Sequence, residues 1–86
     1  MEMMDIFAEF GSLRNGAPDG KEAQAAVKKL KDHITEHYYT CTDEILGALG
    51  MMYAGGGDMT NNIDKAGGKG TAEFAQKAIE AYMKQR

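Results

Sequence analysis

The apolar residues of this 86-residue chain recur every three or four positions along nearly its whole length, which is the period of an α-helix. No segment shows sustained alternation of apolar and polar residues, and the β-branched residues are few and scattered, so no strand is predicted. Glycine-rich breaks divide the pattern, because each glycine inside a helix costs about 1 kcal/mol relative to alanine. The sequence therefore predicts an all-α domain with short connections.

The second and third helices are the clearest predictions. The predicted second helix, over residues 19–38, carries one continuous apolar stripe that must be buried. That stripe consists of Ala23, Val27, Leu30, Ile34 and Tyr38. The third helix opens at Thr42, a good N-cap, and stops at the glycine run that begins at Gly55. Its predicted apolar face consists of Ile45, Leu46, Leu49, Met52 and Tyr53.

Three further helices are predicted over residues 2–13, 58–65 and 70–84. Asp58 is the predicted N-cap of the fourth helix. Lys84 and Arg86 place positive charge where it complements the C-terminal dipole of the last helix. The prediction is thus five helices and no strand.

Length and charge limit the classes of function. A chain of 86 residues forms one domain and buries roughly 60–65% of its unfolded surface. A net charge of −3 leaves no basic footprint for nucleic acid. One cysteine allows no internal disulfide, which is typical of a reducing compartment, so we expect a cytoplasmic protein. There is no apolar run of 18 residues and no signal peptide, so no membrane partner is expected.

The residues best suited to a binding site lie in the stretch HYYTCTDEILGALGMMY, residues 37–53. It places three rings and the only cysteine, Cys41, directly before an apolar helix, whose dipole favours thiolate over thiol. Tyrosine rings and flexible thioethers suit the wall of a cleft. Residues of this kind more often fill a core, but Tyr39 and Met51 fall off the main stripes and are expected to face the site. The predicted ligand-binding residues are Tyr38, Tyr39, Cys41, Met51, Met52, Tyr53 and Phe74.

Metal and catalytic chemistry are less well supported. His33 and His37 are four apart and could share an ion, but nothing fixes the third and fourth ligands that a site needs. A cysteine hydrolase needs a base and an orienting group near the thiol, and only His37 lies near Cys41 in the sequence. We therefore predict no metal site, no cofactor and no enzymatic activity.

The order of the motifs resembles the TipA-S antibiotic-recognition domain, which forms the C-terminal half of MerR-type transcriptional regulators and occurs alone in some short isoforms. The resemblance rests on paired aromatic residues before a cysteine, a glycine-rich helix ending in Met-Tyr, an Asn-Ile-Asp-Lys stretch and a final Gly-x-Ala-x-Phe helix. These segments fall at residues 38–41, 47–53, 62–65 and 70–82. The match covers about residues 23–84.

The resemblance implies a compact, globin-like arrangement of helices without haem. It implies that residues 1–86 form a single effector-binding domain for bulky hydrophobic antibiotics such as thiopeptides, and that residues 1–20 are mobile until the ligand binds. In some members a cysteine attacks a dehydroalanine of the thiopeptide, and Cys41 is the only thiol here that could form such an adduct.

The resemblance further implies a role in transcription regulation and multidrug resistance. The chain has no winged-helix region, so we expect no direct binding of nucleic acid. DNA binding, and any homodimer, would come through the full-length regulator. The chain is accordingly expected to be a free-standing domain, an isoform or an excised piece.

The chain departs from the family pattern at two places. An Asp-x-Arg/Lys-Phe segment is usual between the third and fourth helices, where this chain has residues 55–59. A methionine, Met59, thus replaces a large ring and a basic group is lost, which predicts a looser corner and a reshaped cleft. The second helix also carries Leu30 or His33 where a tryptophan is common.

Two alternatives to reversible effector binding stay open. The same surface could be buried against another copy or a partner helix, in a protein–protein interaction or dimerisation module that binds no small molecule. The second and weaker alternative is a trap that forms a covalent adduct through Cys41.

Overall fold

The structure is a computed structural model that describes residues 3–85. The predicted start of the first helix at Glu2 and the predicted role of Arg86 lie outside the described residues. Within them the chain forms five helices and no strand, which confirms the all-α fold class. The globin-like arrangement in particular stays a prediction. The helices are α1 (Met3–Leu13), α2 (Lys21–His37), α3 (Asp43–Tyr53), α4 (Asp58–Gly67) and α5 (Thr71–Lys84).

The helix ends follow local chemistry, and one of the two predicted N-caps was wrong. Thr42 is the N-cap of α3, as predicted, and its side chain accepts a hydrogen bond from the Ile45 amide at 3.2 Å. Asp58, the predicted cap of α4, is instead its first helical residue, and Gly57 is the cap. Gly57 has φ +90°, a conformation that glycine adopts without steric cost, so the turn takes its shape from the glycine run.

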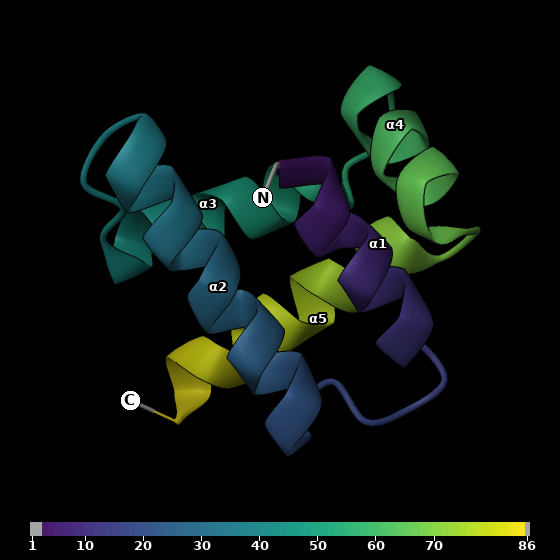
Figure 1. Cartoon of the computed structure of the whole chain (residues 1–86), viewed down its shortest axis with the longest axis horizontal. Helices are drawn as coiled ribbons and strands as arrows, with labels where there is room; N and C mark the ends of the chain where they lie inside the picture. The colour runs from purple at the N-terminus through teal and green to yellow at the C-terminus, as the bar shows by residue number, and fades with distance from the viewer. Residues whose placement is uncertain (1–2, 86) are drawn as a thin grey trace.

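The helices pack in two main pairs, α1 against α4 and α3 against α5, with α2 crossing α1 and α5 (Figure 1). Ile6, Phe7 and Phe10 of α1 are completely buried. Two glycines let α1 and α4 meet backbone to backbone, because a Cβ atom on Gly11 would overlap the carbonyl oxygen of Gly67. The molecule measures 28 × 25 × 24 Å along its principal axes.

The predicted apolar stripe of α2 is buried except at its C-terminal end, and the predicted face of α3 is buried only in part. Ala23, Val27, Leu30 and Ile34 of α2 are all in the core, but Tyr38 is 67% exposed. Its placement on the stripe was wrong because α2 ends at His37 and the backbone of Tyr38 leaves the helix (φ −126°, ψ −69°). On α3, Met52 was wrongly assigned to the buried face, since 57% of it is exposed.

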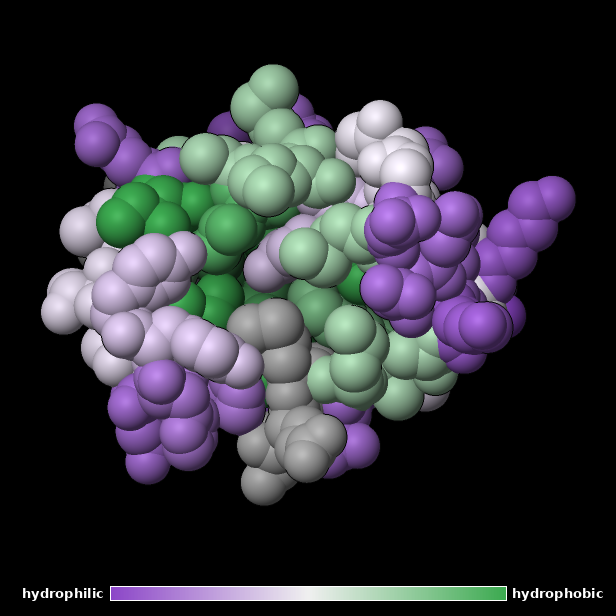
Figure 2. Space-filling view, turned by 90° about the horizontal axis from the view of Figure 1, so that it is seen from above, coloured by the Kyte–Doolittle hydropathy of each residue, from purple (hydrophilic) through white to green (hydrophobic). Residues whose placement is uncertain are grey.

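Several large apolar side chains are exposed on the surface. Figure 2 shows a band of apolar residues across one face, with hydrophilic residues at its sides. The exposed large apolar residues are Met4, Tyr38, Tyr39, Met51, Met52, Met59 and Met83. They come from the first, third, fourth and fifth helices and from the segment after the second. No helix in residues 3–85 is long and apolar enough to cross a membrane.

Candidate functional site

A hollow of about 400 Å³ opens where the C-terminal end of α2 meets α3 and the start of α4. We call it the tyrosine pocket, because three of the four tyrosines of the chain line it. This volume lies within the range of 300–1,000 Å³ that is common for small-molecule sites. The residues that line it are Ile34, Tyr38, Tyr39, Leu49, Tyr53 and Met59.

Tyr38 and Tyr39 form the outer wall of the tyrosine pocket, since they follow the last helical residue of α2. Both backbone amides still donate to the carbonyl oxygen of Ile34, at 2.9 and 3.2 Å, which fixes the chain as it leaves the helix. The segment is tied again a few residues later, where the Cys41 amide donates to the Thr35 hydroxyl oxygen at 3.1 Å. The two rings therefore project from a backbone that is held at both ends.

Tyr53 reaches the pocket from the last turn of α3 and is only 2% exposed. Its ring meets the Phe7 ring edge to face, with 5.1 Å between the centroids. Burial, with smaller effects of Tyr39 and Cys41, raises the pKa of Tyr53 to about 12. The pocket thus presents a neutral phenol at physiological pH, beside two more exposed rings.

Cys41 does not line the tyrosine pocket, and the residue is only 2% exposed. The sulfur lies 3.7 Å from the carbonyl oxygen of Thr42. The expectation that the helix terminus favours the thiolate is wrong, because burial raises the pKa of the Cys41 thiol. The positive charge of Lys31 opposes this increase, and Asp43 adds to it. The thiol is therefore protonated and shielded in the folded protein.

An ion pair holds α2 and α3 together near Cys41. Lys31 Nζ lies 2.9 Å from Asp43 Oδ1 and 3.5 Å from the Tyr82 hydroxyl of α5. The hydrogen bond to Asp43 is the main cause that raises the pKa of Lys31. One ammonium group thus links side chains of three helices, α2, α3 and α5.

The two histidines lie side by side on α2. The His33 and His37 rings are 4.5 Å apart between centroids, as their spacing on α2 predicts. Residues 3–85 contain no group of three or more histidine, cysteine, aspartate or glutamate side chains arranged to hold a metal ion.

The structure divides the other predicted ligand-binding residues among different places. Met51 lines a second hollow, between α3 and α5. Phe74 is buried, meets Phe10 edge to face and lines a third hollow, of about 280 Å³. Met52 is exposed and lines none of these hollows. Only Tyr38, Tyr39 and Tyr53 of the predicted set share one pocket.

Three pocket residues, Ile34, Leu49 and Met59, were not predicted as site residues. Ile34 and Leu49 lie on apolar helix faces, and nothing local distinguishes the end of such a face that borders a pocket. Met59 could have been found from the sequence, because it follows the glycine run at the point where the chain departs from the family pattern. Its side chain is 41% exposed and lines the tyrosine pocket.

Comparison with known proteins identifies relatives of this chain. The TipAS antibiotic-recognition domain family matches residues 1–82. The chain is also similar to the HTH-type transcriptional activator mta of Bacillus subtilis strain 168, with 35% identity over 81 residues. This match covers 94% of the chain and 31% of the activator, so the chain spans about a third of its relative's length. No solved structure gave a significant match.

Proposed function

Given that this chain belongs to the TipAS antibiotic-recognition domain family, a family of effector domains without catalytic activity, we propose that it binds bulky hydrophobic compounds such as thiopeptides in the tyrosine pocket. We further propose that it acts as the effector-binding part of a MerR-type transcriptional regulator. The small-molecule ligand is what a TipAS domain implies. The location of its site and the class of compound are the proposal.

The observation that carries the proposal is the tyrosine pocket itself. Two of its rings, Tyr38 and Tyr39, are 67% and 49% exposed although they belong to an otherwise apolar hollow. Aromatic side chains lose little conformational entropy when they contact a ligand, and they bury a large area. Met59 adds a flexible thioether at the rim, which suits irregular molecules. A compound larger than the 400 Å³ hollow would extend over the exposed rings.

The regulatory context comes from the relative. That protein is named as an HTH-type transcriptional activator, and this chain corresponds to 31% of its length. We therefore propose that DNA binding in the whole regulator belongs to a different part, and that the present domain reports on the effector. A cytoplasmic location belongs to the same proposal.

A thiopeptide titration followed by melting temperature tests the site. We expect thiostrepton to raise the melting temperature of the wild type. Tyr39→Ala should weaken binding about tenfold, because truncation of a central aromatic contact commonly costs more than 1 kcal/mol. Met52→Ala is the matched control, since Met52 is similarly exposed but lies outside the pocket. A thiopeptide that binds both variants and the wild type equally would place the site elsewhere.

Covalent attachment to Cys41 is a separate part of the proposal. The sulfur would add to the β-carbon of a dehydroalanine, the carbon–carbon double bond would become single, and the thiol proton would end on the α-carbon. Because Cys41 is buried and protonated, the reaction requires local opening of the site. Mass spectrometry should then show a slowly formed adduct of the wild type. Cys41→Ser should lose the adduct and retain reversible binding, and an adduct on the serine variant would exclude Cys41.

A further inference from the structure

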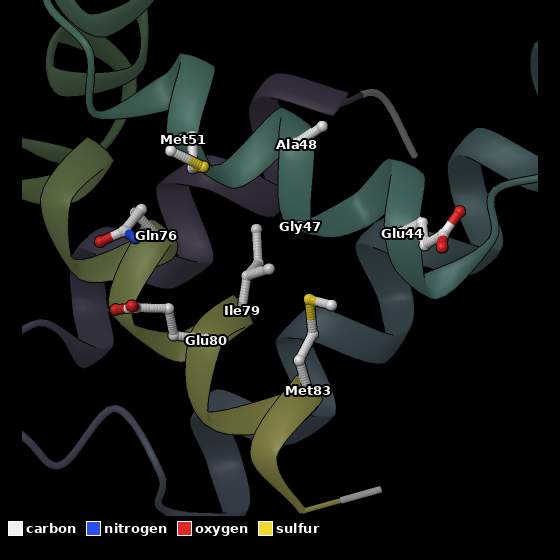
Figure 3. Close-up of a pocket in the computed structure, with 8 residues that line it drawn as sticks. All are labelled: Glu44, Gly47, Ala48, Met51, Gln76, Ile79, Glu80 and Met83. Atoms are coloured by element: carbon white, nitrogen blue, oxygen red, sulfur yellow. The ribbon is translucent and has the colours of Figure 1, made fainter.

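A second hollow, of about 470 Å³, lies on the surface between α3 and α5 (Figure 3). We call it the methionine groove, because Met51 of α3 and Met83 of α5 flank it. Its lining shares no residue with the tyrosine pocket. The other residues that line it are Glu44, Gly47, Ala48, Gln76, Ile79 and Glu80.

The groove exists because α3 is glycine-rich on the side that faces α5. Gly47 carries no side chain, so the end of Met83 lies close to its backbone. A Cβ atom on Gly50 would lie only 3.2 Å from two carbons of Ile79, so the bare glycine lets this side chain lie close against α3. Ile79 is 1% exposed and forms an apolar floor, while 71% of Met51 and 38% of Met83 are exposed. Flexible thioethers beside an apolar floor can adapt to flat or irregular apolar groups.

The charged side chains that line the groove are both acidic. Glu44 and Glu80 are the charged residues that line it; they lie at opposite ends of the groove, and their carboxylates point outward from Ile79 (Figure 3). Neither carboxylate forms an ion pair or a side-chain hydrogen bond with any residue from 3 to 85. An apolar hollow between two unpaired negative charges favours a ligand that is apolar and positively charged.

From this combination we propose that the methionine groove is a second ligand site, selective for lipophilic cations. The apolar part of the ligand would lie on Ile79 between the two thioethers, and its positive charge would be attracted by the carboxylate at either end. The site goes beyond the proposed function, since it needs neither a thiopeptide nor the tyrosines.

The methyl groups of the methionines offer a direct test, because they report on the two hollows separately. Tetraphenylphosphonium titrated into ¹³C-methyl-methionine protein should shift the Met51 and Met83 signals and leave Met59, in the tyrosine pocket, unchanged. Uncharged triphenylphosphine oxide should bind more weakly. Shifts confined to Met59, or equal affinity for the two compounds, would overturn the proposal, as would the absence of any shift at millimolar concentration.

Variants test the roles of charge and shape. Each of Glu44→Gln and Glu80→Gln should weaken tetraphenylphosphonium binding about two- to fivefold, the range of an exposed charge interaction. Glu36→Gln, at an exposed carboxylate that lines neither hollow, is the matched control and should have no effect. Ala48→Phe should fill the groove from an exposed helix position and abolish binding.

Two further readouts separate this proposal from its competitors. If Met51 and Met83 shift with protein concentration alone, the groove holds a second copy of the chain, and the cation site is wrong. The Tyr39→Ala variant should bind tetraphenylphosphonium like the wild type. Failure of thiopeptide binding with intact cation binding would therefore overturn the proposed function and leave the second site standing.

Discussion

At the scale of single residues, Tyr53 couples the tyrosine pocket to the pH dependence of stability. Burial raises its pKa to about 12, against 10.0 in the unfolded chain. The unfolded state therefore loses this proton first as the pH rises, and folding loses stability between pH 10 and pH 12. Two pKa units correspond to on the order of 2–3 kcal/mol.

Urea unfolding at several pH values measures this effect. We expect Tyr53→Phe to remove part of the alkaline loss of stability, since phenylalanine keeps the contact with Phe7 but has no proton to lose. Tyr38→Phe removes a hydroxyl from an exposed side chain and is the matched control. Equal alkaline loss in the wild type and in both variants would show that Tyr53 is not the responsible group.

The single thiol gives a second prediction at this scale. Cys41 is buried, and its pKa is raised by that burial, so a thiol reagent should react slowly with the native protein at pH 8 and rapidly in denaturant. The reaction rate with Ellman's reagent measures this difference. Equal rates in the folded and unfolded states would mean that the thiol is open to solvent.

At the scale of helices, the start of α3 fixes the loop that carries the tyrosines. The Thr42 hydroxyl oxygen accepts from the Ile45 amide at 3.2 Å, and loss of such a cap costs about 0.5–2 kcal/mol. Thr42→Ala should therefore lower the free energy of unfolding by about 1 kcal/mol. Thr40→Ala, at an exposed threonine two residues earlier, should change it little. Similar losses in both variants would argue against the cap.

The close contact between α1 and α4 leaves no room for a side chain at Gly11. A Cβ atom on Gly11 would overlap the backbone of Gly67, and backbone cannot move aside as a side chain can. Gly11→Ala should destabilise the protein by about 1–3 kcal/mol or more, measured by urea unfolding. Gly16→Ala is the control, because the nearest atom would lie 3.4 Å from the new Cβ. Tolerance of Gly11→Ala would mean that the helices do not meet this closely.

The sequence predicts these helices well because their period and their breaks are local properties. The cap at Thr42 and the buried stripe from Ala23 to Ile34 were predicted for that reason. Tyr38 was misplaced because a helix that ends one residue earlier turns the next side chain outward. The site was harder to predict, since Tyr39 and Met59 meet only after α2, α3 and α4 have packed. The burial of Cys41 is likewise a result of packing, and it outweighs the local effect of the helix terminus.

At the scale of the whole molecule, α1 connects the tyrosine pocket to the core. Three α1 side chains are completely buried: Ile6, Phe7 and Phe10. The Phe7 ring packs directly against the ring of Tyr53, and Tyr53 also lines the tyrosine pocket. A ligand that holds Tyr53 in place should therefore also hold α1. This is the physical route by which the expected ordering of residues 1–20 could follow from binding.

Hydrogen exchange measures this coupling. We expect a bound thiopeptide to slow amide exchange in α1 as well as in α3, because a ligand that binds only the folded state suppresses local opening. Phe7→Leu should keep most of the apolar volume but lose the edge-to-face contact with Tyr53, and so reduce the ligand effect on α1 relative to α3. Phe10→Leu, which changes a ring that packs against Phe74 instead, is the control. Protection that appears in α3 but never in α1 would mean that α1 is held by the core alone and takes no part in recognition.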